Sequence, residues 1–316
     1  MDNVKVLVLG AGNISCVYDW DNQFIKTHCK ALANIKNLSV SIYDINETLA
    51  LKSAKRYNFL HIDKFEKINF NFYDWIVIAS STDTHFTYLK RAILEKVPLV
   101  ICEKPIASSI DELKTLEELY EMGQTKVIVN YIRRFQKKYI ELRKLLSAID
   151  SIPSSISVTY QRGISNNFSH ASDLLEFLFG KFSLTQINVF SKFFDEFTND
   201  PTISFSALFN NNIQLIANGI RNAKYSYFEI EIFFSSYKIH IAKNGNEIQW
   251  YSSEEYQTFY HPLKYDCNLS STNVLENSMV DVYNFVSSVY ANDTHDNFLS
   301  SIKNNNTLLK IIQCQN

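Results

Sequence analysis

The first 130 residues alternate between short apolar runs and segments of helical periodicity, and this alternation most constrains the fold. Short apolar runs with no polar alternation indicate strands buried on both faces, which occur in parallel sheets covered by helices. The sequence therefore predicts an α/β fold, with a doubly wound parallel Rossmann sheet in an N-terminal domain. The predicted strands are 4–9, 38–44, 74–79, 98–102 and 126–130.

The pattern changes after residue 130, and strands dominate the rest of the chain. One helix is expected at 169–179 and two more at about 274–290 and 298–312. A chain of 316 residues suits two domains. We therefore predict a dinucleotide-binding domain at 1–130 and an α+β domain with a mainly antiparallel, open-faced sheet at 131–316, for substrate binding and oligomerisation. Its predicted strands are 155–160, 184–190, 203–209, 213–217, 225–234, 237–242 and 247–251.

A glycine turn follows the first predicted strand. Gly10 and Gly12 occupy the first two glycine positions of the dinucleotide fingerprint G-x-G-x-x-G, and Ser15 stands in the third. The first glycine allows the tight turn, the second allows a pyrophosphate to approach the backbone, and the third position needs only a small residue. We expect Gly10, Gly12, Asn13 and Ile14 to contact the phosphates at the N-terminus of the next helix.

Asp44 ends the second predicted strand, at about the distance expected for the residue that binds the adenosine ribose. A carboxylate there can accept hydrogen bonds from both ribose hydroxyls and would repel a 2′-phosphate. The sequence therefore favours NAD over NADP as cofactor. The alternative is that Asp44 caps the helix beginning near Asn46.

Two further groups of polar residues follow predicted strands, where ligands of open α/β sheets bind. The first group is the loop after strand 74–79, in which Ser80, Ser81, Thr82 and His85 are candidate cofactor contacts. The second is Glu103-Lys104-Pro105, which follows strand 98–102. Lys104 is a candidate for contact with the reacting group, and a cis Lys104–Pro105 bond could direct it inward. The alternative is that both charges merely end the strand in solvent.

A polar cluster opens the helix at 169–179. His170 and Asp173 lie one turn apart on a helical face, and Arg162, Asn166 and Asn167 lie just upstream. Histidine is the usual proton acceptor near neutral pH, so His170 could take the proton of an alcohol while a nicotinamide takes the hydride. Lys104 could stabilise the negative charge that develops on the same oxygen. A hydrogen-bonded structural histidine is the alternative.

Composition excludes several other classes of protein. A net charge of −2 and a pI near 6.4 give no reason to expect a nucleic-acid partner, and no apolar run is long enough to span a bilayer. The five scattered cysteines indicate reduced thiols in a cytoplasmic protein. No metal site is predicted, because no His, Cys, Asp and Glu cluster has ligand spacing.

The chain resembles the Gfo/Idh/MocA family, which includes glucose–fructose oxidoreductase and inositol dehydrogenase. The resemblance covers nearly the whole chain, and Glu-Lys-Pro together with His-x-x-Asp is its specific part. The residues that carry it are Gly10-Ala-Gly12-Asn-Ile, Asp44, Ser81-Thr-Asp-Thr-His85, Glu103-Lys104-Pro105, Arg134-Phe135, His170-Ala-Ser-Asp173 and Gly180.

The resemblance implies a tightly bound NAD(H) or NADP(H), and a reacting hydroxyl contacted by Lys104 and His170. It also implies a role for Asp173 in binding a polyol or sugar, and a homodimer or homotetramer formed through the C-terminal sheet. We expect Arg162, Asn166 and Asn167 to bind substrate and Glu103 to support the nicotinamide ribose or the backbone. The predicted function is an NAD-dependent sugar, polyol or nucleotide-sugar oxidoreductase.

Two departures from the family pattern leave a second function open. Asn166 stands where the family often has an aspartate, and Phe168 stands where it usually has a glycine, which would narrow the pocket or shift the backbone. The alternative function is a non-catalytic dinucleotide-binding sensor or assembly subunit. The segment from Gly163 to His170, with Thr27-His28, is similar to members associated with surface-polysaccharide biosynthesis, which suggests a sugar or nucleotide-sugar substrate.

Overall fold

The computed structural model describes residues 3–149, 152–195, 197–210, 212–254, 261–292 and 294–314. The chain divides into two compact units, each made of two segments. The first unit is Met1–Phe135 with Glu276–Asn306, and the second is Gln136–Leu275 with Thr307–Asn316.

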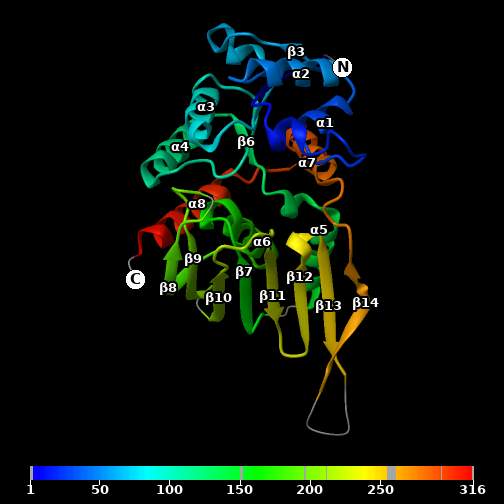
Figure 1. Ribbon diagram of the computed structural model, residues 1–316, viewed down its shortest axis with the longest axis vertical. Helices are drawn as coiled ribbons and strands as arrows, with labels where there is room; N and C mark the ends of the chain where they lie inside the picture. The colour runs from blue at the N-terminus through cyan, green and yellow to red at the C-terminus, as the bar shows by residue number, and fades with distance from the viewer. Residues whose placement is uncertain are drawn as a thin grey trace. The chain divides into compact units, whose positions relative to one another are not determined.

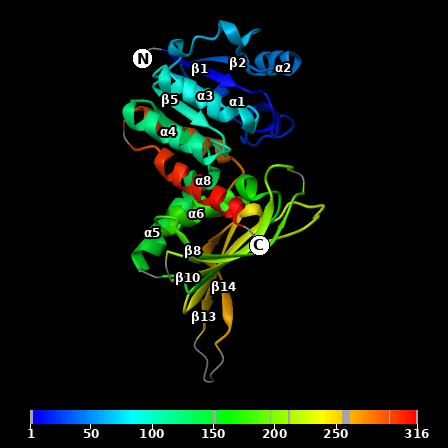
Figure 2. The same cartoon turned by 90° about the vertical axis from the view of Figure 1, so that its left-hand side faces the viewer.

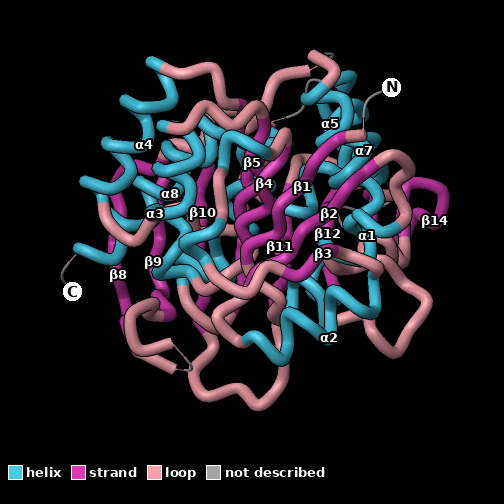
Figure 3. The backbone as a smooth tube through the Cα atoms, turned by 90° about the horizontal axis from the view of Figure 1, so that it is seen from above, coloured by secondary structure: helices cyan, strands magenta, loops and turns pink. Residues whose placement is uncertain are grey.

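The first unit contains the predicted parallel sheet. Its six strands are all parallel and lie in the order β3-β2-β1-β4-β5-β6, which is the order of the dinucleotide-binding Rossmann fold. Figure 3 shows the run from β3 to β5. The order reverses between β1 and β4, and in such sheets ligands bind where this reversal occurs. The strands are β1 (Val4–Leu9), β2 (Leu38–Tyr43), β3 (Leu60–His61), β4 (Trp75–Ile78), β5 (Leu99–Cys102) and β6 (Lys126–Val129).

Helices complete the first unit. Helices α3 and α4 pack against each other, while α1 packs against both α2 and α7. Strands β4 and β5 are buried along their whole length, because the apolar runs have no solvated face. The helices are α1 (His28–Ala33), α2 (Glu47–Tyr57), α3 (Thr82–Leu94), α4 (Ile110–Met122) and α7 (Ser278–Tyr290).

Helix α7 lies in the first unit, although the predicted division of the chain placed it in the second. Met279, Val282 and Val286 are fully buried in the hydrophobic core that also contains Val6 and Val8 of β1. The apolar face of α7 thus covers part of the Rossmann sheet. A helix pattern in the sequence shows which face is apolar but not which sheet that face will cover.

The second unit is built on an eight-stranded, mainly antiparallel sheet, as predicted (Figure 1). Among the described strands of this sheet only β7 and β10 pair in parallel. Asn244-Gly245 forms the turn between β12 and β13. Strand β14 was not predicted, because most of its side chains are polar or exposed. In sheet order the strands are β14 (Leu263–Ser271), β13 (Glu247–Ser253), β12 (Tyr237–Ala242), β11 (Phe228–Phe233), β7 (Ser155–Tyr160), β10 (Ile213–Gly219), β9 (Thr202–Phe209) and β8 (Leu184–Phe193).

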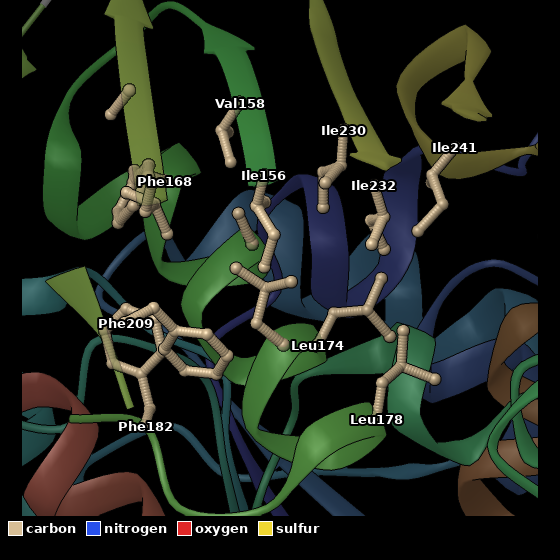
Figure 4. Packing of buried hydrophobic residues seen from close by; sticks show 14 of the residues in the cluster. Ile156, Val158, Phe168, Leu174, Leu178, Phe182, Phe209, Ile230, Ile232 and Ile241 are labelled. Carbon is tan, nitrogen blue, oxygen red and sulfur yellow. The ribbon is translucent and has the colours of Figure 1, made fainter. Parts of the chain in front are cut away.

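Helices α5 (Lys137–Ile149) and α6 (Ser169–Phe179) pack on one face of this sheet, with the end of α8 (Phe298–Gln313) (Figure 2). Leu174 and Leu178 of α6 point toward Ile156 of β7 and Ile232 of β11 in the core of the unit (Figure 4). This packing fixes the helix that carries His170. Strands such as β10 alternate strictly between buried and more exposed residues, so the opposite face of the sheet is open among the described residues.

Candidate functional site

The glycine turn after β1 has the geometry of a phosphate-binding turn. Gly10 has φ +109°, and a Cβ atom there would lie 2.4 Å from the carbonyl oxygen of Ala79. A Cβ atom on Gly12 would meet no heavy atom within 4 Å, so open space lies in front of that residue. Ser15 is fully buried, and its hydroxyl donates to the Gly10 carbonyl at 2.6 Å. The residues present therefore fit a dinucleotide pyrophosphate.

No regular helix begins directly after the turn. Residues Asn13–Val17 form one short π-helical turn, in which Asn13 is exposed and Ile14 is half-buried. The next regular helix, α1, starts only at His28. The intervening loop is held by Asp19, whose fully buried carboxylate accepts hydrogen bonds from the Thr27 amide at 2.9 Å and from the Thr27 hydroxyl at 2.9 Å.

Asp44 lies at the end of β2, next to the glycine turn. One carboxylate oxygen accepts the Ala11 amide at 2.6 Å, and the other accepts the Asn46 amide at 2.7 Å. The side chain of Asn46, not that of Asp44, caps α2 by accepting the Leu49 amide. Asp44 is half-exposed, and each carboxylate oxygen has a second lone pair that can accept another hydrogen bond.

Four of the predicted cofactor contacts lie in the loop after β4 and in the first turn of α3, because the helix begins at Thr82, earlier than the predicted loop allows. Ser81 and Thr82 are exposed at the start of α3, and the Ser80 hydroxyl lies 2.7 Å from that of Thr84. His85 is buried, and its ring nitrogens lie 2.8 Å from the Pro105 carbonyl and 3.2 Å from the Ser80 carbonyl. His85 therefore connects the loop after β4 to the loop after β5.

The Lys104–Pro105 peptide after β5 is cis, as predicted, and Lys104 is half-buried. The Glu103 carboxylate is bound by two side chains that sequence reasoning missed, namely His28 and Asn130. Burial raises the pKa of Glu103, but the interaction with His28, the hydrogen bond from Asn130 and the charge of Lys104 together bring it below its ordinary value. Glu103 is therefore an anion at neutral pH.

In the second unit, the polar cluster before α6 is held by aspartates that the sequence did not reveal. The Asp195 carboxylate accepts the Arg162 amide at 3.1 Å, and the Asp200 carboxylate accepts the amides of Ser165 and Asn166 at 2.8 and 2.7 Å. A Cβ atom on Gly163 would lie 2.1 Å from Asp200. Nothing in the local sequence distinguishes these aspartates from ordinary loop residues.

The predicted substrate residues Asn166 and Asn167 both use their side-chain amide groups within this cluster. Asn166 Nδ2 donates to the Arg162 carbonyl at 3.1 Å, and Asn167 Nδ2 donates to the Gln161 carbonyl at 2.8 Å. Both side chains remain half-exposed. Arg162, with φ +67°, lines a pocket of about 370 Å³. The other residues that line this pocket are Gln161, Asp195, Asn222, Ala223, Lys224, Tyr225 and Ser226.

His170 and Asp173 lie on α6 as predicted. His170 is half-buried, with its ring edge-on to Phe228, and Asp173 is only 1% exposed. Of the two effects expected of Phe168, a narrower pocket or a shifted backbone, the structure does not favour the first, because the ring is fully buried and packs against Tyr160 and Phe205. The ring of Phe168 is accommodated because it lies in the hydrophobic core of the second unit.

Two further properties of the described ranges bear on other kinds of site. None of the helices there is long and apolar enough to cross a membrane. No cluster of three or more His, Cys, Asp and Glu side chains is arranged to hold a metal ion in that part of the chain. All five cysteines are free thiols, and Cys16 and Cys29 lie side by side in the first core.

Comparison with known proteins agrees with this geometry. Residues 4–131 match the Gfo/Idh/MocA family, described as an oxidoreductase family with an NAD-binding Rossmann fold. This match over residues 4–131 supports the predicted family resemblance and the predicted NAD-binding Rossmann fold.

Several individual proteins are also similar to the chain. The inositol 2-dehydrogenase of Acidothermus cellulolyticus is 26% identical over 196 residues, which cover 56% of this chain and 54% of that protein. The glucose-6-phosphate 3-dehydrogenase of Bacillus subtilis is 25% identical over 158 residues, 49% of this chain and 41% of that protein. The chain thus aligns with about half the length of these relatives.

A solved structure extends the likeness in fold to the second unit. The UDP-N-acetylglucosamine 3-dehydrogenase of Acidithiobacillus ferrooxidans superposes with a TM-score of 0.76 over 98% of this chain and 97% of that one, at 15% identity. At this identity the likeness concerns the fold alone. The predicted two-part architecture is confirmed by this superposition and by the two sheets.

Proposed function

We propose that this protein is an NAD-dependent oxidoreductase that transfers a hydride between a nicotinamide and a hydroxyl or keto group of a sugar, polyol or nucleotide sugar. The observation that carries the proposal is the open space at Gly12, which lies where the strand order of the sheet reverses. Lys104 follows β5 of the same sheet. The relatives named as inositol and sugar-phosphate dehydrogenases support the class of substrate.

The proposed chemistry divides between the cofactor and the protein. The bound nicotinamide supplies the acceptor or donor of the hydride. His170 accepts the hydroxyl proton, or returns it when a keto group is reduced. Lys104 donates a hydrogen bond to the reacting oxygen and stabilises its developing negative charge. Arg162, Asn166, Asn167 and Asp173 bind the other polar groups of the substrate.

The test is the absorbance of reduced nicotinamide when purified protein and NAD are mixed with inositols, sugars, sugar phosphates and nucleotide sugars. Oxidation of one of these compounds is the expected result. A protein that binds NAD and turns over none of them, in either direction, would be the non-catalytic sensor or assembly subunit instead.

Asp44 is proposed to set the preference for NAD. The Asp44→Asn variant keeps a side-chain oxygen that can accept the Ala11 amide. It lacks the negative charge that would repel a 2′-phosphate. We expect the ratio of the NADP to the NAD dissociation constant to fall at least about tenfold, a change of about 1.4 kcal/mol, measured by calorimetry. Asp63→Asn, at an exposed carboxylate paired with Lys67, is the matched control. Tighter binding of NADP by the unaltered protein would contradict the argument.

The open face of the second sheet is proposed to form a homodimer or homotetramer. It exposes apolar side chains, including Phe190 of β8 at 56% and Ile216 of β10 at 39%. Light scattering should give a particle mass of two or four times the chain mass. The Ile216→Glu variant should give a lower particle mass, because it places a charge in the apolar interface. A monomer at micromolar concentration would rule the interface out. Free thiols support a cytoplasmic location for the enzyme.

A further inference from the structure

A buried chain of four polar side chains lies in the first unit beside the peptide that carries Lys104. It runs from Tyr283 on α7 through His28 on α1 to Glu103 after β5, and ends at Asn130 after β6. His28 Nδ1 lies 2.9 Å from the Tyr283 hydroxyl, and His28 Nε2 lies 3.0 Å from Glu103 Oε1. Asn130 Nδ2 donates to the same oxygen at 2.6 Å. The exposed fraction is 0% for His28 and 7% for Glu103.

The directions of these hydrogen bonds follow from the groups involved. An ionised carboxylate only accepts, so His28 Nε2 must carry a proton that it donates to Glu103. His28 Nδ1 is bonded to the Tyr283 hydroxyl, accepting from it when the ring is neutral and donating to it when the ring is charged. The Glu103 carboxylate thus keeps a proton on Nε2, and the bond to the Tyr283 hydroxyl helps to hold the plane of the ring.

The charge of Glu103 depends on this chain. Burial alone would favour the neutral acid, and the donors His28 and Asn130 reverse that preference. Folding lowers the pKa of Glu103, so the ionised carboxylate stabilises the folded protein. This contribution to folding stability is complete above about pH 4.5 and is lost as the pH falls through the pKa of Glu103 in the folded state. The nearby thiols of Cys29 and Cys102 and the Tyr283 phenol are neutral, because burial raises their pKa values.

Lys104 lies between two residues whose positions are fixed by side chains. On one side the Glu103 carboxylate is bound by His28 and Asn130. On the other, the Pro105 carbonyl is bound by His85 Nδ1 at 2.8 Å. The negative charge of Glu103 also attracts the Lys104 ammonium, an interaction that contributes to the lowered pKa of the carboxylate. A change at His28 would therefore alter both the position and the electrostatic environment of Lys104.

Local structure explains how His28 reaches this place. The loop before α1 is longer than a dinucleotide turn requires, yet Asp19 binds the amide and hydroxyl of Thr27 and so fixes the start of the helix. Thr27 then caps α1 by accepting the Lys30 amide, and His28 is the first helical residue. Its ring lies edge-on to that of Tyr283.

We propose that His28 and Tyr283 are positioning residues of the reaction, which hold the Glu103 carboxylate ionised and thereby fix Lys104. The effect on turnover rests on the proposed function, whereas the effect on Glu103 does not. Neither residue touches the substrate in this account. Both act through Glu103.

The primary experiment follows the side-chain ¹³Cδ resonance of Glu103 with pH in protein labelled at glutamate, with Glu103→Gln to assign it. In the unaltered protein the carboxyl group should remain ionised from pH 5 to 9. In His28→Leu its titration should move up by about one to two pH units, because the lost bond was to a charged group. His28→Gln, which keeps an N–H donor, should restore most of the original titration.

Tyr283→Phe provides a second variant in case His28→Leu does not fold, since it removes a single hydroxyl. It should shift Glu103 in the same direction by a smaller amount. Tyr160→Phe is the matched control, because it removes a buried hydroxyl, bound to the Ile203 carbonyl, in the other unit. It should leave the Glu103 titration unchanged.

Activity gives the second readout. If a substrate is found, kcat/KM at pH 7 should fall about tenfold or more in His28→Leu and recover in His28→Gln. An unchanged Glu103 titration in both His28→Leu and Tyr283→Phe would overturn the proposal. A shifted titration in a protein that turns over no sugar would support the buried chain and count against the proposed function alone.

Discussion

His170→Ala and Lys104→Ala are each expected to abolish most turnover while leaving NAD binding and folding intact. Removing the proton acceptor should lower kcat by about 10²–10⁴-fold. Removing the lysine that stabilises charge on the reacting oxygen should lower it by about 10²–10³-fold. The measurement is the initial rate of nicotinamide reduction at saturating substrate, with calorimetry to follow NAD binding.

Controls for these variants are available in the same chain. Lys114→Ala removes an exposed lysine whose ammonium lies 3.7 Å from Asp111, and His295→Ala removes an exposed histidine between α7 and α8. Both should retain full activity. The double variant of Lys104 and His170 should lose less than the product of the two single losses, because both side chains are proposed to act on one oxygen. Single variants that turn over like the unaltered protein would show that the assigned residues are wrong.

Gly10→Ala and Gly12→Ala should have opposite consequences, although the two glycines are two residues apart. The Cβ of Gly10→Ala would lie 2.4 Å from the Ala79 carbonyl oxygen at a φ of +109°. The strained backbone conformation of the alanine and its steric overlap with Ala79 together predict that the variant loses about 2–6 kcal/mol of folding stability. Gly12→Ala meets no atom within 4 Å and should fold normally. It should still weaken NAD binding at least about tenfold, since its methyl group fills the space proposed for the pyrophosphate.

Thermal unfolding and calorimetry separate the two effects. Gly10→Ala should unfold at a clearly lower temperature, whereas Gly12→Ala should unfold at the original temperature but lose the stabilisation that added NAD provides. Undiminished NAD affinity in Gly12→Ala would place the pyrophosphate elsewhere. Normal stability in Gly10→Ala would contradict the turn geometry.

Short-range features of the first unit were predictable because each depends on neighbours in the chain. Gly10 follows a buried strand directly, Asp44 ends the next one, and Lys104-Pro105 follows the apolar run of β5. The parallel sheet follows from buried strands separated by helices, which leave few alternative topologies. The asparagine–glycine turn of the second sheet was predicted for the same reason, since Asn244 and Gly245 adopt positive φ angles.

The residues that support the site were not predictable, because their partners are distant in sequence. Tyr283 is 255 residues from His28, and the two meet only because α7 packs on the Rossmann sheet. Asp200 reaches the loop before His170 from the turn between β8 and β9. Each of these side chains has a common residue type and no distinctive spacing.

The sequence alone therefore determined the type of chemistry: a glycine turn, an acidic strand end, a lysine before proline and a histidine on an amphipathic helix. Local backbone requirements and hydrophobic periodicity carry that information. Only the tertiary structure decided which other residues hold these groups in place. Around Glu103 these are His28 and Asn130, with Tyr283 bound to His28. A buried charge requires partners, and the fold supplies them from whichever segments it brings together.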